Sequence, residues 1–469
     1  MTIFSSSRSS DRTLSLTLLS VLGSASLLLA AASTAQAVTT PKGTAAVPVT
    51  IPNPLTLDQA VSIALSHLPA VDSARTQIDQ ANGVKEEDQS QYFPKVTVGY
   101  QYLNDTQQSY GGRAFTTQTY SAQQGGGSTL SLSQLLFDNG SRENNNKLGR
   151  QGVYAAKDQY QFERQNATLN VTVDYYNLLL DQDLIKVAQA QVDLFQQTVD
   201  LTNAQIQAGT AAASSIYQAQ ADLANARVTL LQDQNSVKTA TAALKNVMGV
   251  ETDAPITLAE APQGADSLPV IPAAPPDETL DSLLAIADEK RPDLDAEEHL
   301  VEEQEVNLKQ ARDNAGITIS TTYTGTLQAT NDLGSKGLNS EVLATATYPI
   351  FDGGFNQGAV RVAKAQRDAA RDEYKTVRQE VRQQVEQALY NQTEAFGAAS
   401  LAEAAVKAAQ VNVDAAIAER KEGVGTTLDV TTAVATLAQA QNQYVTAVYN
   451  TYSTQAILDE AVGRINTNR

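Results

Sequence analysis

The 469-residue chain carries 33 Lys and Arg against 52 Asp and Glu, a formal net charge of −19, and it contains no cysteine. The acidic balance argues against a nucleic-acid partner, which normally requires a basic face. The lack of cysteine excludes a disulfide framework and a lipid-modified cysteine, so an exported form of the chain has to be stable through packing alone.

The first 37 residues have the pattern of a secretory signal peptide. Arg8 and Arg12 form a basic start, an apolar run follows from Leu14 to Ala32, and Ala35-Gln36-Ala37 is a small-x-small cleavage site. The alternative is an uncleaved membrane anchor, but five Ser and Thr residues dilute the run. We therefore predict a signal peptide over 1–37 and a flexible segment over 38–54. After the signal, no apolar run reaches the about 20 residues of a transmembrane helix.

The rest of the chain contains an internal duplication. Phe137-Asp138-Asn139-Gly140 returns 214 residues later as Phe351-Asp352-Gly353-Gly354, and Gly209 returns as Gly423. A second register, offset by 223 residues, aligns Pro69 with Pro292. The change of offset lies between Tyr100 and Phe137, which predicts an insertion confined to one loop. We predict a first repeat over 55–250, a proline-rich linker over 251–277, a second repeat over 278–463 and a tail over 464–469.

Each repeat opens with a helix that contains a proline. The first helix is predicted from Leu57 to Tyr92 and contains Pro69, and its counterpart from Leu280 to Asn314 contains Pro292. A proline inside a helix removes a backbone donor and clashes with the preceding turn. Both helices should therefore be kinked or split at the proline.

A β-hairpin follows each of these helices, over 95–137 and over 317–350. Val96, Val98, Tyr100 and Tyr102 share one face of the first strand, and the second hairpin repeats this alternation around Tyr323. Return strands are predicted over 128–136 and 341–350. The segments 104–127 and 329–340 are rich in Gly, Gln, Ser and Asn, which is typical of exposed hairpin tips. Each strand would then have about 9–11 residues, enough to cross a bilayer at a tilt.

Two very long helices come next, over 138–208 and 352–422, with Asp138 and Asp352 as candidate N-caps. Helices of this length would reach about 100 Å. Shorter helices over 214–248 and 427–462 follow, and Gly249 and Gly463 are natural helix terminators. Two shorter helices placed end to end would match the length of each long helix.

Four strands leave two open edges, whose backbone groups lipid cannot satisfy. Transmembrane barrels need at least about eight strands, so strands in a membrane would require the chain to oligomerise. Five aromatic residues are then candidates for a membrane-interface girdle, namely Tyr100, Phe137, Tyr323, Tyr348 and Phe351. The alternative is a soluble four-stranded sheet with ordinary tyrosine packing.

The order and spacing of several motifs resemble the TolC-like outer-membrane efflux proteins, or outer membrane factors. The resemblance runs from Leu55 to Gly463, and it is carried by Leu55-Thr56-Leu57-Asp58-Gln59-Ala60, Tyr92-Phe93-Pro94, Tyr348-Pro349-Ile350-Phe351-Asp352-Gly353-Gly354 and Glu422-Gly423-Val424-Gly425. It implies a mainly α fold with a transmembrane β part. Three chains, each giving four strands, would form one twelve-stranded β-barrel continuous with a long periplasmic α-helical coiled-coil barrel.

The same resemblance implies partners, a location and candidate sites. The homotrimer would sit in outer-membrane lipid, span into the periplasm, and couple through a periplasmic adaptor protein to an inner-membrane pump of the RND, ABC or MFS class. Adaptor docking would fall on the tips, which are Ala208-Gly209-Thr210 and Glu422-Gly423-Val424. The alternative for these tips is a plain helix–turn–helix break.

Asp429, Thr432 and Gly425 are the candidate pore constriction. Asp429 falls on an aspartate position of the family's gate, and a trimer would make it a ring of three carboxylates that favours cations. The pattern departs elsewhere, because Thr432 replaces a second aspartate and Gly425 an arginine, and Arg420 and Ser215 also differ. The alternative for Asp429 is an ordinary solvated side chain.

Catalytic and metal-binding motifs are lacking in the sequence. There is no HExxH, no phosphate-binding loop and no nucleophile elbow, and His67 and His299 coincide under neither repeat offset and are expected to be solvated. We therefore expect no metal, no cofactor and no enzyme. Two function classes remain: a passive outer-membrane exit duct of a tripartite efflux or type I secretion system, and a structural periplasmic coiled-coil scaffold or surface protein. The paired hairpins favour the duct, and the cargo stays open.

Overall fold

The computed structural model describes residues 51–111, 117–251, 255–259, 268–273, 278–330 and 336–465. The expected signal peptide, residues 38–50 of the segment 38–54 and the last four residues of the tail lie outside the described residues. The chain from Pro52 onward forms one compact unit, and the description below concerns that unit.

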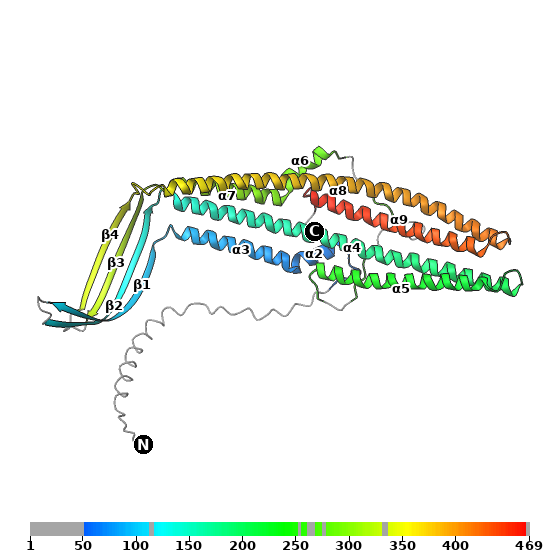
Figure 1. The fold of residues 1–469 in the computed structure, drawn as a ribbon, viewed down its shortest axis with the longest axis horizontal. Coiled ribbons are helices and arrows are strands. Elements are labelled where there is room, and N and C mark those ends of the chain that lie inside the picture. Colours follow the sequence, from blue (N-terminus) through cyan, green and yellow to red (C-terminus); the bar gives the residue numbers. More distant parts are fainter. Residues whose placement is uncertain are drawn as a thin grey trace, which may run out of the picture. The chain divides into compact units, whose positions relative to one another are not determined.

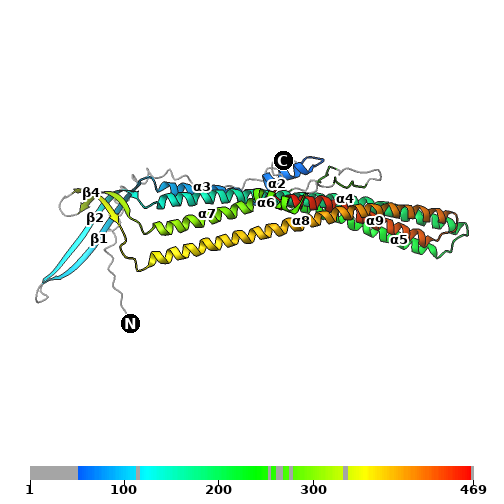
Figure 2. The ribbon, with the colours of Figure 1, turned by 90° about the horizontal axis from the view of Figure 1, so that it is seen from above.

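Two long helices form the frame of this unit. α4 (Ser141–Gln207) and α8 (Phe355–Lys421) have 67 residues each, which corresponds to about 100 Å. They are linked through α7 (Pro292–Asp313) in the half next to the strands and through α9 (Thr427–Ala461) in the other half (Figures 1 and 2). Within the described ranges, no helix is both long and apolar enough to span a bilayer.

Shorter helices lie along the long ones. α2 (Leu57–His67), α3 (Pro69–Ser90) and α5 (Ser215–Val247) pack on α4, whereas α6 (Leu280–Lys290), α7 and α9 pack on α8. The expected proline breaks are confirmed, because both prolines begin a new helix. The residues before them, Leu68 and Arg291, are extended, as the ring of a following proline requires.

The last helix of each repeat ends against the proline break. Gly249 and Gly463 have φ of +67° and +73°, a conformation that residues with a Cβ rarely adopt. A Cβ on Gly249 would lie 2.7 Å from the carbonyl oxygen of His67, and one on Gly463 would lie 2.7 Å from that of Lys290. These glycines therefore end the helix and also let it abut the broken helix, which stacks the two short helices end to end.

Within the described ranges, four strands form one antiparallel sheet in the order β1-β2-β3-β4. They are β1 (Lys95–Gly111), β2 (Thr117–Phe137), β3 (Thr318–Thr330) and β4 (Lys336–Thr347). β1 and β2 have 17 and 21 residues, so the prediction of about 9–11 residues per strand is wrong for the first hairpin.

The predicted loop 104–127 is largely strand, and the insertion in the first repeat lengthens its hairpin. Alternation of apolar residues stops in this polar segment, but strand pairing uses backbone groups and continues as far as the pair Gly111 and Thr117. The second hairpin ends earlier than the predicted residue 350. β4 stops at Thr347, two residues before Pro349, which has no N–H to donate.

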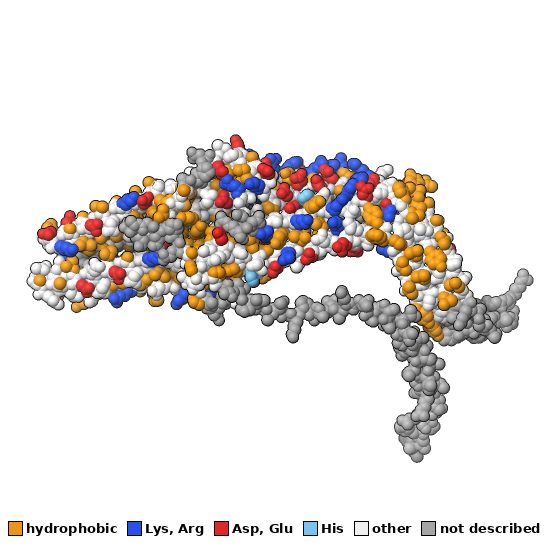
Figure 3. Space-filling view, turned by 180° about the vertical axis from the view of Figure 1, so that it is seen from behind, with side chains coloured by type: hydrophobic (Ala, Val, Ile, Leu, Met, Phe, Trp, Pro, Cys, Tyr) orange, Lys and Arg blue, Asp and Glu red, His pale blue; other side chains and the backbone are white. Residues whose placement is uncertain are grey.

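The two faces of the sheet differ in polarity. Cross-strand neighbours on one face are mainly apolar, as in the row Val96, Leu132, Tyr323 and Val342. The row beside it on the other face is Thr97, Ser131, Thr324 and Glu341. Hydrophobic side chains accordingly spread over the strands in Figure 3. The apolar face is exposed, with Val98 70% and Val342 73% accessible.

Tyrosines of α4 and α9 bond to neighbouring segments of the chain. The Tyr175 hydroxyl donates to the carbonyl oxygen of Leu55 at 3.1 Å, and the Tyr444 hydroxyl donates to that of Pro269 at 2.8 Å. The buried Tyr449 hydroxyl donates to Asp183 Oδ2 at 2.6 Å, and burial, together with this bond, raises the pKa of Tyr449. The described stretch of the predicted linker around Pro269 is thus tied to α9.

Candidate functional site at the two ends of the long helices

Both long helices end in the same turn at the tip far from the strands. Gly209 and Gly423 each have φ of +75°. The N–H of Thr210 donates to the carbonyl oxygen of Gln205 at 2.9 Å, and that of Val424 donates to Glu419 at 3.0 Å. This is the Schellman arrangement, in which a left-handed glycine lets the chain satisfy the last helical carbonyls. The predicted adaptor-docking tips are therefore tight turns with defined hydrogen bonds.

A reciprocal cap closes the second tip. The Thr426 N–H donates to Asp429 Oδ2 at 2.8 Å, and the Asp429 N–H donates to Thr426 Oγ1 at 3.2 Å. This capping box satisfies free amides at the start of α9. The hydrogen bonds from the Thr426 hydroxyl and N–H, and then the charge of Arg420, hold the pKa of Asp429 below its usual value.

Arg420 braces the same turn from the end of α8. Its Nη1 donates to the carbonyl oxygen of Gly425 at 3.3 Å, and its Nη2 donates to Thr427 Oγ1 at 2.7 Å. A Cβ on Gly425 would lie 3.1 Å from the Arg420 backbone nitrogen. The small residue therefore lets the chain fold back closely onto the end of α8, within reach of the guanidinium group.

The first tip has neither the cap nor the brace. In the repeat register, Ala212 stands in the place of Thr426, Ser215 in that of Asp429 and Ile206 in that of Arg420. The Ser215 hydroxyl donates back to the Ala212 carbonyl oxygen at 2.7 Å, and α5 has no side-chain cap. As a result α5 begins two repeat positions later than α9 does.

The candidate constriction residues do not form one cluster. Asp429 and Thr432 are exposed and three residues apart on α9, whereas Gly425 lies in the turn against α8. One face of a helix carries side chains three residues apart, so Asp429 and Thr432 share a surface. The alternative of an ordinary solvated Asp429 is incomplete, because its carboxylate caps the helix.

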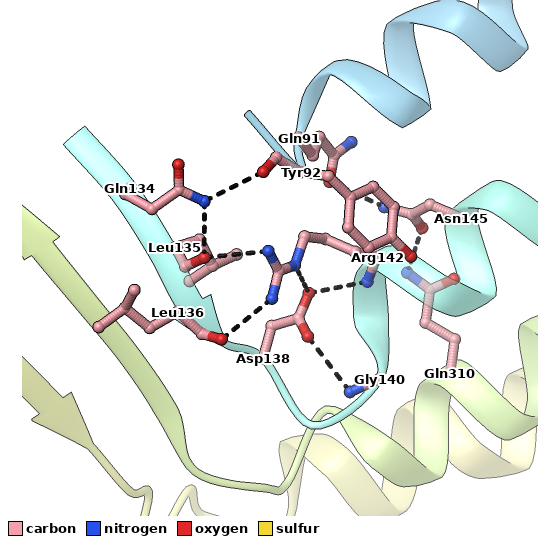
Figure 4. Close-up of polar contacts among 10 residues, drawn as sticks. All are labelled: Gln91, Tyr92, Gln134, Leu135, Leu136, Asp138, Gly140, Arg142, Asn145 and Gln310. Carbon is pink, nitrogen blue, oxygen red and sulfur yellow. Dashed lines mark hydrogen bonds and ion pairs between the residues drawn. The ribbon is translucent and has the colours of Figure 1, made fainter. Parts of the chain in front are cut away.

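At the other end, Arg142 clamps the junction between β2 and α4 (Figure 4). Its Nε donates to Asp138 Oδ2 at 3.0 Å, while Nη1 and Nη2 donate to the carbonyl oxygens of Leu135 and Leu136 at 2.9 and 3.2 Å. The Arg142 and Asp138 side chains are only 13% and 9% exposed. The guanidinium group thus ties the last strand carbonyls to the first turn of the helix.

Asp138 acts from two positions before the formal N-cap, Gly140, which is left-handed. Its Oδ1 accepts from the Gly140 N–H at 3.3 Å and its Oδ2 from the Arg142 N–H at 2.8 Å. Asp352 repeats these bonds with the amides of Gly354 and Asn356, each at 2.9 Å, which lowers the pKa of Asp352. In the described chain, Asn356 makes no counterpart of the Arg142 clamp.

The five candidate girdle aromatics lie at different levels of the sheet. Phe137 pairs with Ile319 at the end of the sheet next to the helices. Tyr348 and Phe351 lie at the same end, just after β4, and are 63% and 89% exposed. Tyr100 lies eight residues farther along the strands, and its hydroxyl covers Gly126. Tyr323 lies midway. The register therefore separates these residues along the apolar face instead of collecting them in one ring.

The sequence reasoning missed Arg142, Arg420 and Thr426. Two of them had a signal, since Thr426 and Asp429 have the capping-box spacing and Asp138 and Arg142 the i, i+4 spacing. Arg420 had none, because its partners include a carbonyl in a turn.

The expectation that His299 is solvated is wrong. Its side chain is 27% exposed, with Nε2 3.4 Å from Asp158 Oδ2. The described residues include no group of three or more candidate metal ligands.

Comparison with known proteins decides the family. The family model described as outer membrane efflux protein matches residues 60–250 and 283–464, most of both repeats. The chain belongs to the outer membrane efflux protein family. The outer membrane efflux protein BepC of Brucella suis is 27% identical over 346 residues, which cover 72% of each chain. The outer membrane protein TolC of Escherichia coli is 23% identical over 399 residues, covering 81% of this chain and 76% of TolC.

A solved structure has the same fold. CusC, from a study of its folding and transmembrane channel formation, superposes with a TM-score of 0.74 at 18% identity and covers 89% of this chain and 93% of its own. The predicted membership in the TolC-like outer-membrane efflux proteins is confirmed. This outer membrane efflux protein is accordingly a passive exit duct in the outer membrane that extends into the periplasm. Members of the family are channel proteins and not enzymes.

Proposed function

We propose that three copies of this chain close their sheets into one twelve-stranded barrel whose polar face lines the exit route. The observation that carries this proposal is a sheet with one apolar face and one polar face, whose outer strands β1 and β4 have no further partner in the described chain. A backbone N–H or C=O group that has no hydrogen-bond partner in lipid costs several kcal/mol of free energy. Since β1 and β4 run in opposite directions, β4 of one copy can pair antiparallel with β1 of the next.

The tips are the proposed contact with a periplasmic adaptor protein, which would couple the duct to an inner-membrane pump of the RND, ABC or MFS class. Ala208-Gly209-Thr210 and Glu422-Gly423-Val424 are exposed turns at the end opposite the sheet. Val424 is 82% accessible. Small residues allow a close approach of a partner helix, and the bonded turns hold them in place.

Asp429 and Thr432 are the proposed lining of the constriction, and Gly425 shapes the turn before them. Asp429 is exposed, and its lowered pKa keeps it ionised at neutral pH. In a trimer, three such carboxylates would form a ring that attracts cations. The capping bonds of Asp429 support a fixed position for that charge.

Extraction of the outer membrane and reconstitution into planar bilayers test this function. We expect a heat-resistant trimer in the outer-membrane fraction and discrete conducting channels. Asp429→Ala should weaken block of the current by multivalent cations, whereas Asp414→Ala, an exposed aspartate elsewhere on α8, should leave it unchanged. A monomeric protein in the soluble periplasm would contradict the duct and favour the scaffold. Unchanged block in the Asp429 variant would remove that residue from the constriction.

A further inference from the structure

The junction between α7 and the half of α4 next to the strands joins the two repeats within one chain. α7 has eight acidic and two basic residues, and residues 141–168 of α4 have five basic and three acidic ones. Hydrogen bonds cross the junction, with Gln310 Nε2 donating to Asn145 Oδ1 at 2.9 Å and Asn144 Nδ2 to Asp313 Oδ2 at 3.1 Å. An acidic short helix thus lies against a more basic long helix.

At the strand end of this junction, a larger residue covers a glycine. Asn139 Nδ2 donates to the Asp313 carbonyl oxygen at 2.6 Å, and the Asn139 side chain occupies the space above Gly316. Any Cβ on Gly316 would collide with it, since the nearest Asn139 atom would be 2.1 Å away. Asn139 itself has a left-handed φ of 55°, which asparagine tolerates better than most residues.

The same elements recur at the two outer edges of the chain. By the repeat offsets, α3 corresponds to α7 and α8 corresponds to α4. α3 has five acidic and two basic residues, whereas residues 355–382 of α8 have seven basic and four acidic ones. Within the described chain, α3 packs on α2 and α4, and α8 packs on α6, α7 and α9. On each of these two helices, the side that its counterpart uses in the α4–α7 junction is therefore free of contacts within the described chain.

The sizes of the two end residues are reversed at these edges. Phe93 stands in the repeat place of Gly316, and Gly353 in that of Asn139. Phe93 is 70% exposed. Gly353 keeps the left-handed backbone, with φ of +66°, and in the described part of the chain no atom lies within 4 Å of a Cβ added to Gly353 or Gly358. An exposed aromatic ring on one edge thus matches an open patch of glycines on the other.

We propose that α3 of one copy packs against the half of α8 next to the strands in a second copy, with Phe93 over Gly353. This rests on the proposed trimer and deepens it. The contact repeats the internal α4–α7 junction in charge and backbone, and it buries an aromatic ring that water otherwise surrounds. The internal junction pairs Gly316 with Asn139, whereas the proposed one pairs Phe93 with Gly353. If α3 of another copy packed on α4 instead, Phe93 would collide with Asn139. The Phe93–Gly353 pair therefore favours α8 over α4 as the helix on which α3 of another copy seats.

Cross-linking tests the geometry directly, since the chain has no native cysteine. Ser90 and Gly358 are the repeat counterparts of Asp313 and Asn144. The double variant Ser90→Cys/Gly358→Cys, treated with a short bismaleimide in outer membranes, should give covalent dimers and trimers. Ser90→Cys/Gly397→Cys, with the second cysteine farther along α8, should give none. Asn144→Cys/Asp313→Cys should cross-link within one chain and shows that the reagent reaches such a site.

A size swap tests the selection. Gly353→Asn should make the detergent-extracted trimer dissociate about tenfold faster, corresponding to about 1.4 kcal/mol, and Phe93→Gly should also weaken it. The double variant Phe93→Gly/Gly353→Asn recreates the internal pair and should recover most of the loss. Additive losses, or a trimer that forms without the 90–358 cross-link, would overturn the inference while leaving the trimer intact. A chain that forms no trimer would overturn the proposed function as well.

Discussion

The two repeats are braced at opposite ends. The first repeat is clamped where the strand meets the long helix, through Arg142 and Asp138. The second is fixed at the tip, through Arg420 and the Thr426–Asp429 cap. Both keep the same left-handed glycines and proline breaks, so the backbone of the duplication has survived while the side chains that stabilise its ends have diverged.

The second strand-to-helix junction, which lacks the arginine clamp, carries three strongly exposed apolar residues. At the second strand-to-helix junction, Ile350, Phe351 and Phe355 are 91%, 89% and 80% accessible. This junction follows β4, the free edge of the sheet, so in the proposed trimer a second copy or lipid would cover it. The comparison teaches that the first junction is tied together by side chains of its own chain, whereas the second junction leaves its apolar side chains for a neighbour to cover.

The largest effects should come from glycines that the two repeats share. Gly249→Ala and Gly463→Ala should each destabilise the protein by about 4 kcal/mol, because a Cβ adds both left-handed strain and a backbone collision. Gly209→Ala and Gly423→Ala are matched controls that have the same φ sign and no atom near the added Cβ, so we expect about 1 kcal/mol for each. Thermal unfolding followed by circular dichroism measures this. Unequal effects of the two repeat partners would contradict the shared backbone.

The clamp at the first junction should have the next largest effect. Arg142→Leu leaves the nearly buried Asp138 without its ionic partner, and breaking such a pair should cost about 3 kcal/mol. The control is Asn356→Leu at the equivalent position of the second repeat, where we expect a change within about 0.5 kcal/mol. Urea unfolding of the detergent-solubilised protein compares them. Similar losses in both variants would show that the junctions are equally braced.

The tip cap should contribute about 1 kcal/mol locally. Thr426→Ala removes the capping hydroxyl and keeps the charge of Asp429, whereas Asp429→Asn removes the charge and keeps an acceptor for the Thr426 N–H. Hydrogen exchange at the start of α9 should accelerate most in Thr426→Ala and by a smaller, still measurable factor in Asp429→Asn. Cation block of the channel should change in the opposite order. In the first tip, Ala212→Thr should slow exchange at the start of α5, and the absence of any slowing would refute the cap as the cause of the difference.

The smallest expected effect is the pH dependence of this cap. The hydrogen bonds from Thr426 lower the folded-state pKa of Asp429, so its contribution is fully present above the unfolded pKa and is lost as pH falls through the lower, folded pKa. Burial raises the pKa of Asp158, which acts with the opposite sign, so the wild type must be compared with Asp429→Asn. Their exchange rates at the start of α9 should converge as pH is lowered from 7 to 3. A constant difference would exclude Asp429 ionisation.

Local rules predicted part of the two ends from the sequence and missed the rest for identifiable reasons. The tip glycines and the Asp138 and Asp352 amide bonds follow from short-range backbone geometry, and the structure contains them. The clamp of Arg142 on two strand carbonyls depends on how a strand enters a helix, which residue spacing alone does not specify. The length of the first hairpin was underestimated, because its outer part pairs through backbone groups without apolar alternation.

The sequence by itself determined the duplication, the proline breaks, the two equal long helices and the family, since these depend on chain spacing and on residues with restricted backbones. Only the tertiary structure decided where the chain is braced and which edges stay open. Gly249 illustrates the difference: its role as a helix end is local, but its contact with His67 joins segments 182 residues apart. Packing between distant segments depends on the whole fold, and no local pattern contains it.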